Sequence, residues 1–170
     1  MSRDGPAVFH EVQRFRSRRI WLMVAIPPFG MTLLLVWQVI LGHTWGKQPL
    51  SNASVIGWTI FLWLIYLRLI TVRLVTDVNP AELRVAMRGF WRQRRIALSD
   101  IQTAQIVTYD AARDWGGYGI RNTRRGTAYL AGGDRGVRLK LVKGATVLIG
   151  SARPDDLLAA VKQRRGAVLE

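Results

Sequence analysis

The feature that most constrains the fold is an apolar stretch from Val55 to Leu74, VIGWTIFLWLIYLRLITVRL. It holds no charge before Arg68 and no proline, and residues 55–72 would form a helix of about 27 Å at ~1.5 Å per residue. That length is close to the ~30 Å hydrocarbon core of a bilayer. Arg68 and Arg73 lie near its end, where long cationic side chains reach the membrane interface. The stretch predicts a membrane helix over 55–72.

A second apolar stretch, 20–41, precedes the first and carries no charge. Pro27 and Pro28 lie inside it, and because prolines remove backbone donors we expect them to interrupt or kink this helix. Residues 42–54 are short and polar, so the two helices are expected to form an antiparallel transmembrane hairpin over 20–72.

Positive charge flanks this hairpin on both sides. Residues 1–19 carry five arginines against two acidic residues, and residues 73–170 carry 18 basic against nine acidic residues. The positive-inside rule then predicts a multi-pass membrane protein with both termini cytoplasmic. Within the N-terminal arm, Phe9, Val12 and Phe15 fall near helical spacing. A short interfacial helix is one interpretation, and a basic topogenic flank is the favoured one.

Histidine and cysteine usage narrows the chemistry. The chain has no cysteine, which excludes disulfides, thiolate catalysis and cysteine metal sites. Its two histidines, His10 and His43, both precede residue 73, so residues 73–170 lack the commonest general base. We therefore expect no cofactor and no metal. Three loop aspartates might otherwise act together in acid–base work, but turn formation and pairing with arginines are favoured: Asp110, Asp114 and Asp134.

After Arg73 the hydrophobic pattern changes to a period of two, which indicates strands. One helix is expected at the end, begun by Pro154, favoured by Asp155 and Asp156 in its first turn, and stopped by Gly166. Its apolar stripe would be Leu157, Leu158, Ala160 and Val161. Seven strands are expected, over 74–78, 82–87, 90–98, 101–109, 127–130, 136–142 and 145–150.

Such a plan predicts an α+β membrane protein in three parts. A basic arm (1–19) precedes the transmembrane hairpin (20–72, with helices 20–41 and 55–72). A cytosolic pleckstrin-homology-like (PH-like) domain follows over 73–170, as a seven-stranded antiparallel β-barrel capped by the C-terminal helix.

Several segments also resemble one known family. They are EVQRFR (11–16), RLITVRLVT (68–76), GGYGIR (116–121), GDRGVRLKL (133–141) and IGSARPDDL (149–157). Together they make the chain similar to an uncharacterised family of small bacterial inner-membrane proteins with two N-terminal transmembrane helices and a cytosolic PH-like domain. The resemblance implies the fold and the topology, and it implies no activity.

Two groups of residues are candidates for binding. If side chains alternate along the expected strands, six cations share one polar face. This face could hold anionic headgroups, each charge adding about 1 kcal/mol, or it could simply be a solvated exterior. The six cations are Arg84, Arg88, Arg92, Arg94, Arg138 and Lys140. The second group is a glycine loop whose amides and arginine could hold a phosphate, although a twisted loop with positive φ is the favoured interpretation. It comprises Trp115, Gly116, Gly117, Tyr118, Gly119 and Arg121.

These features favour a non-enzymatic, membrane-anchored interaction module whose basic domain binds protein partners or the anionic membrane surface. Open strand edges would also allow self-association into a homo-oligomer. The alternative is an accessory subunit of a larger membrane complex, and a metal-dependent or hydrolytic enzyme is the third and least favoured class. Nucleic acid is not expected as a partner, because the membrane tether makes lipid the nearer anion.

Overall fold

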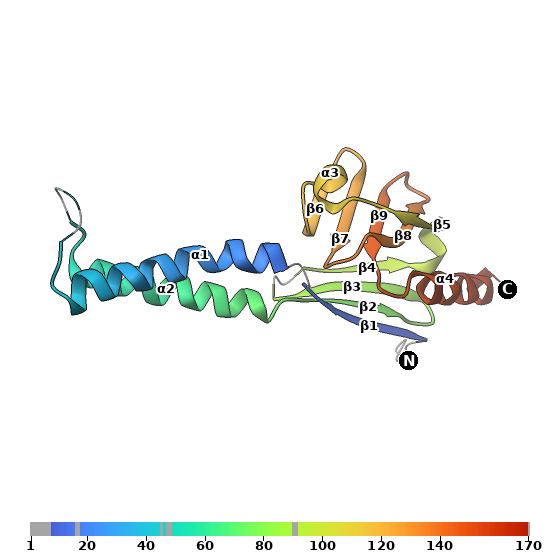
Figure 1. The fold of residues 1–170 in the computed structure, drawn as a ribbon. Coiled ribbons are helices and arrows are strands. Elements are labelled where there is room, and N and C mark those ends of the chain that lie inside the picture. The colour runs from blue at the N-terminus through green and yellow to red at the C-terminus, as the bar shows by residue number, and fades with distance from the viewer. Residues whose placement is uncertain (1–7, 16–17, 45, 47–48, 90–91, 170) are drawn as a thin grey trace. The chain divides into compact units, whose positions relative to one another are not determined.

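The computed structural model describes residues 8–15, 18–44, 46, 49–89 and 92–169 (Figure 1). The chain forms two compact units, one made of residues 17–71 and the other of residues 1–16 together with 72–170. The second unit is therefore discontinuous in sequence, and the first is inserted into it.

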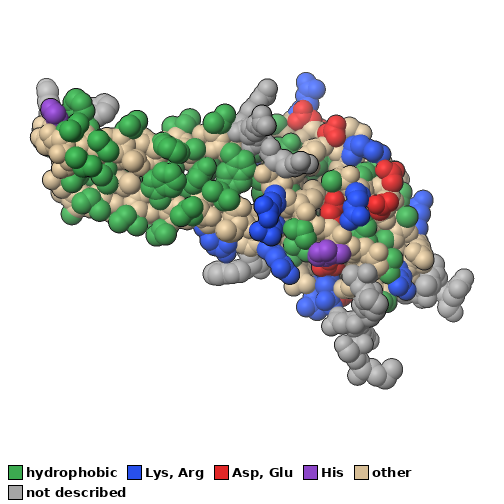
Figure 2. Space-filling model, turned by 60° about the horizontal axis from the view of Figure 1, so that its bottom comes forward, with side chains coloured by type: hydrophobic (Ala, Val, Ile, Leu, Met, Phe, Trp, Pro, Cys, Tyr) green, Lys and Arg blue, Asp and Glu red, His purple; other side chains and the backbone are tan. Residues whose placement is uncertain are grey.

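The inserted unit is a helical hairpin. Helix α1 (Arg18–Leu35) continues as a π-helical turn, η1 (Val36–Ile40), and α2 (Asn52–Ile70) returns alongside it. Both are long and apolar enough to cross a membrane, over Ile20–Ile40 and Asn52–Ile70. Hydrophobic side chains cover most of the face of the hairpin that Figure 2 shows. Helix α1 continues through Pro27 and Pro28 without interruption, and the π-helical turn falls later, from Val36. The kink expected at the two prolines stays a prediction.

Polar side chains of the hairpin are satisfied between its own helices. Buried Gln38 donates through Nε2 to the carbonyl oxygen of Leu50 at 2.5 Å and to Oδ1 of Asn52 at 3.0 Å. Trp63 Nε1 donates to Thr32 Oγ1 at 3.0 Å. In hydrocarbon an unpaired polar group costs several kcal/mol, so these bonds allow the outside of the hairpin to remain apolar.

The other unit begins with a four-stranded antiparallel sheet in the order β1-β2-β3-β4. Its strands are β1 (Phe9–Arg14), β2 (Arg73–Val78), β3 (Glu82–Arg88) and β4 (Arg92–Ala97). Strand β1 precedes the hairpin in sequence but pairs with β2, from Phe9 opposite Val78 to Arg14 opposite Arg73. The short interfacial helix considered for residues 9–19 is therefore wrong over 9–14, which form a strand.

A five-stranded sheet follows, in the order β5-β8-β9-β7-β6. The 3₁₀ turn η2 (Leu98–Asp100) leads into β5 (Ile101–Thr108), and the short helix α3 (Ala111–Trp115) leads into β6 (Gly119–Thr123). Strands β7 (Gly126–Leu130), β8 (Arg135–Leu141) and β9 (Thr146–Gly150) complete the sheet, and β7 pairs with β9 in parallel. The predicted seven-stranded antiparallel barrel is not seen, because the described residues form nine strands in two open sheets.

The two sheets enclose one apolar core, and α4 (Pro154–Leu169) lies at one end between them (Figure 1). Leu157, Ala160 and Val161 of α4 are buried in this core, as the apolar stripe predicts, but the helix passes through Gly166 instead of stopping there. Strand β1 is attached to the start of α4 by polar contacts. The buried carboxylate of Glu11 accepts hydrogen bonds from Ser151 Oγ at 2.6 Å and from the Ala152 amide at 2.9 Å.

Candidate anion-binding surfaces

The six cations predicted to share one face lie in three places. Arg84 and Arg88 project from the outer face of the four-stranded sheet, opposite to the face of the buried Leu83, Val85 and Met87. In register, Arg92 lies opposite Met87 and Arg94 opposite Val85, which assigns both positions to the other face. Arg138 and Lys140 belong to the outer face of the five-stranded sheet. The single basic face is therefore divided between two sheets.

A different set of arginines does come together. Arg14 on β1, Arg73 on β2 and Arg88 on β3 lie directly opposite one another across three neighbouring strands. All three are exposed on the outer face, and we name them the arginine row. Figure 2 looks onto this side of the unit and shows basic side chains gathered on it. Sequence reasoning missed Arg14 and Arg73 as members, although one precedes the first apolar stretch and the other follows the second.

Acidic groups on the same outer face are engaged away from the row. His10 Nδ1 contacts Asp77 Oδ1 at 2.5 Å, and Arg84 pairs with Glu82. Among the described residues, none makes a hydrogen bond or ion pair with the side chains of Arg14, Arg73 or Arg88. A hollow of about 340 Å³ extends from the row across the sheet and is lined by residues that include Val75, Asp77, Arg84, Ala86, Arg88 and Gln93.

The glycine loop adopts the positive φ angles that the loop interpretation expects: Gly116 at 69°, Gly117 at 116° and Gly119 at 107°. Its amides are engaged in ending α3, since the Gly116 amide donates to Ala112 O at 3.1 Å and the Gly117 amide to Ala111 O at 2.7 Å. Arg121 donates through Nε to Tyr118 O at 3.0 Å. These donors therefore form hydrogen bonds to the loop itself and to the end of α3.

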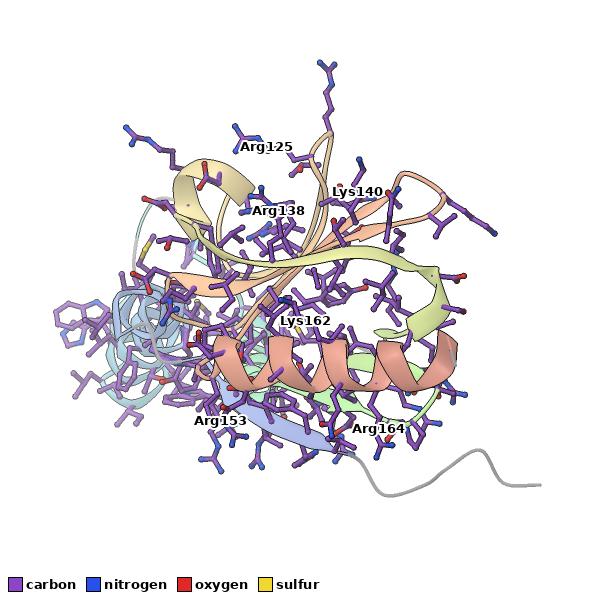
Figure 3. All side chains as sticks on the ribbon, turned by 90° about the vertical axis from the view of Figure 1, so that its right-hand side faces the viewer. Arg125, Arg138, Lys140, Arg153, Lys162 and Arg164 are labelled. Atoms are coloured by element: carbon purple, nitrogen blue, oxygen red, sulfur yellow. The ribbon has the colours of Figure 1, made fainter. Side chains whose placement is uncertain are left out.

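A cleft of about 390 Å³ lies between α3 and the outer face of the five-stranded sheet. It brings together Arg138 from the predicted basic face and Trp115 from the predicted glycine loop. We name it the α3 cleft, and its lining is Tyr109, Asp114, Trp115, Arg125, Arg138 and Thr146. Figure 3 shows Arg125, Arg138 and Lys140 on the side of the sheet away from α4.

Charges in the α3 cleft are fixed by local hydrogen bonds. Asp114 accepts from the Asp110 amide at 2.9 Å and from Arg125 at 3.1 Å, and these contacts lower the pKa of its carboxyl group. Burial, with smaller contributions from Tyr118 and Asp134, raises the pKa of the Tyr109 phenol. Tyr109 donates to Gly132 O at 3.1 Å. At neutral pH the cleft therefore holds one carboxylate, two guanidinium groups and a neutral phenol.

The loop aspartates have separate roles. Asp110 caps α3 by accepting from the amides of Ala112 and Arg113 at 2.9 and 3.0 Å, while Asp114 forms its ion pair with Arg125. The predicted turn formation and pairing are seen for these two, and Arg125 is the partner of Asp114. Within the described part of the chain, no group of three or more His, Asp or Glu residues is placed to hold a metal ion.

No protein-family model matches this chain, and no curated protein matches it significantly. The geometry of the two surfaces is therefore the basis for assigning a function.

Proposed function

We propose that the chain is a membrane-anchored interaction module whose arginine row contacts anionic lipid headgroups. The observation that carries this proposal is the pairing of β1 with β2, the two strands that flank the helical hairpin. Because these strands are antiparallel neighbours, the chain leaves the sheet and returns to it at the same end, where Arg14 lies opposite Arg73.

Few residues separate this end of the sheet from the helices in the sequence. Arg14 is four residues before the first residue of α1, and Arg73 is three residues after the last residue of α2. At no more than ~3.6 Å per residue, these links span at most about 14 Å and about 11 Å. If the hairpin crosses the bilayer, both arginines stay within reach of the headgroup region.

The charges of the row favour a negative partner. Neighbouring strands are ~4.8 Å apart, so Arg14, Arg73 and Arg88 form a line of like charges in which direct neighbours repel one another. An anionic lipid surface removes this repulsion and adds about 1 kcal/mol for each arginine near it. The hollow beside Arg88 offers room for a headgroup on the same face.

The location and the finer fold belong to the same proposal. The pairing of β1 with β2 requires both strands to lie on one side of a membrane that the hairpin crosses twice, and the basic flanks favour the cytoplasmic side of a bacterial inner membrane. We take the two open sheets and α4 as an open variant of the PH-like plan.

Native mass spectrometry of the full-length chain tests this function. The chain is extracted in mild detergent from membranes that contain phosphatidylglycerol, and the lipid molecules that it retains are counted. The variant R14Q/R73Q/R88Q removes the arginine row, whereas R95Q/R124Q/K143Q removes the same charge from positions outside it. We expect the first variant to lose most of its phosphatidylglycerol and the second to retain it.

A charge-conserving variant separates lipid binding from a structural role. R14K/R73K/R88K keeps the positive row and is expected to retain phosphatidylglycerol. Amide exchange of β1 and β2 in each variant reports whether the sheet is intact. Equal lipid retention by R14Q/R73Q/R88Q and the unmodified chain would contradict the proposal.

An accessory subunit of a membrane complex is the second candidate, and one observation favours it. A groove of about 340 Å³ on α2 is lined by Ser54, Gly57, Trp58 and Phe61. Small residues at such positions let a second transmembrane helix approach closely. A Cβ at Gly57 would have no described heavy atom within 4 Å, so the side chain of Gly57→Leu begins in the open space of the groove. Loss of crosslinks to one dominant membrane partner in G57L would support this role.

A further inference from the structure

We propose that the α3 cleft binds the phosphate group of a small phosphorylated molecule, at a site separate from the arginine row. Its volume of about 390 Å³ lies in the lower part of the range of small-molecule sites, roughly 300–1,000 Å³. It opens on the outer face of the five-stranded sheet, whereas the arginine row lies on the outer face of the four-stranded one.

Arg138 is the first donor that the cleft offers. It lies on β8 between β5 and β9, in register with Gln105 on one side and Leu148 on the other. A position with strands on both sides holds the backbone of a binding residue more firmly than a loop does. The side chain of Arg138 is exposed, and none of the described residues forms a hydrogen bond or ion pair with it.

Arg125 is the second donor, and two features hold it at the cleft. Gly126, with φ of 121°, approaches the chain at Thr146 so closely that a Cβ there would lie 2.2 Å from the Thr146 carbonyl oxygen. The β6–β7 turn is thereby packed against the start of β9. Asp114 then accepts a hydrogen bond from Arg125 Nη1 at 3.1 Å, which orients the guanidinium group.

The lining matches a phosphate better than a neutral ligand. Guanidinium groups bind phosphate oxygens through charge-assisted hydrogen bonds, and the Thr146 hydroxyl at the same cleft is a further donor. Lys140 lies opposite Thr146 in register and adds positive charge on the same face. Asp114 is the opposing charge, and its carboxylate is already paired with Arg125. The two arginines therefore leave one positive charge uncompensated.

Isothermal titration of the full-length chain in nanodiscs of phosphatidylcholine tests the site, with inorganic phosphate and glucose 6-phosphate as probes. The variant R138Q removes the unpaired guanidinium, and R124Q removes the same charge from the neighbouring β6–β7 turn, outside the cleft lining. We expect saturable binding that weakens about tenfold or more in R138Q and stays within about twofold in R124Q, as for the loss of one charge-assisted hydrogen bond. Amide exchange of β8 and α3 verifies that R138Q remains folded.

A second arm distinguishes a soluble phosphate from a lipid headgroup. If neither probe binds, the chain is moved to nanodiscs that contain phosphatidylglycerol, and lipid retention is compared between R138Q and R124Q. A loss confined to R138Q supports the site with a lipid phosphate as its ligand. The proposal is overturned if no probe binds and both variants retain lipid equally, or if R138Q binds the probes as the unmodified chain does. R14Q/R73Q/R88Q is expected to bind the probes normally, so this test and the lipid test fail independently.

Discussion

The outer faces of the two sheets are both basic, but they differ in what lies over them. On the four-stranded sheet, Arg14, Arg73 and Arg88 are exposed, and neither helix of their own unit, α3 or α4, packs over them. On the five-stranded sheet, α3 packs Trp115 against the face and creates a second, smaller apolar cluster there. The first face offers charge to an extended surface, and the second offers charge within a cleft. Under the two proposals, the first face contacts a lipid surface and the second holds a small phosphorylated molecule.

Removal of Trp115 should produce the largest effect and should act on one face alone. Trp115 is 4% exposed and packs in the cluster that contains Ala128, Leu130 and Leu148. Replacing a buried tryptophan with alanine typically costs about 3–5 kcal/mol. We expect Trp115→Ala to lower the free energy of opening, measured by amide exchange in α3, β6 and β7, by about this amount. The amides of β1 and β2 should retain their protection. Equal loss of protection in both sheets would show that the two faces do not act separately.

The inner side of β1 should give the next effect. The Glu11 carboxylate is buried and accepts two hydrogen bonds from the segment before α4. Hydrogen bonds to a charged group contribute about 1.5–3 kcal/mol, and Glu11→Ala also leaves the Ser151 hydroxyl without this acceptor. We expect destabilisation of about 2–3 kcal/mol in chemical unfolding of the full-length chain. Ser151→Ala should cost less, because the carboxylate keeps its bond from the Ala152 amide. Unchanged stability of E11A in chemical unfolding would contradict the proposed attachment of β1 to α4.

Glu11 also explains why β1 was not predicted as a strand. The strands over 82–88 and 135–141 could be predicted because their inward residues are apolar in alternation. In β1 the inward positions after Phe9 are Glu11 and Gln13, whose partners Ser151 and Gly150 lie 140 and 137 residues away. A local pattern contains no sign of such partners. Phe9, Val12 and Phe15 instead suggested a helical period.

The division of the basic face has a related cause. The sequence assigned Arg84, Arg88, Arg92 and Arg94 to one side because a single alternating pattern was carried through both strands. In the sheet Arg94 lies opposite the buried Val85, and a one-residue change of register exchanges the two faces of a strand. The arginine row requires the pairing of β1 with β2, and the α3 cleft requires the short helix α3, neither of which the pattern contained.

Acid should destabilise α3, which packs on the outer face of the five-stranded sheet, without a comparable effect on the arginine row. The pKa of Asp114 is lowered from 3.8 because the Asp110 amide and Arg125 both donate to the carboxylate. A carboxyl group with a lowered folded-state pKa adds stability above its unfolded value, and that stability is lost as the pH falls through the folded-state value. We expect amide exchange of α3 to increase as the pH falls below about 4. We expect this acid response to be smaller in Asp114→Asn, which lacks the carboxylate that pairs with Arg125. An acid response that persists unchanged in D114N would assign the effect to another group.

The smallest effect should come from Arg73, at the centre of the arginine row. Its two neighbours in register are Arg14 and Arg88, and like charges directly opposite one another destabilise a sheet. Arg73→Gln in uncharged detergent should therefore be neutral or slightly stabilising, whereas Lys143→Gln, in the β8–β9 turn, should leave stability unchanged. With phosphatidylglycerol added, the sign should reverse, because the unmodified row then gains lipid contacts that R73Q lacks. Thermal unfolding with and without this lipid shows whether R73Q is more or less stable than the unmodified chain in each condition. If Arg73 stabilises the sheet in the absence of lipid, the row has a structural partner, and the contrast with the covered face no longer holds.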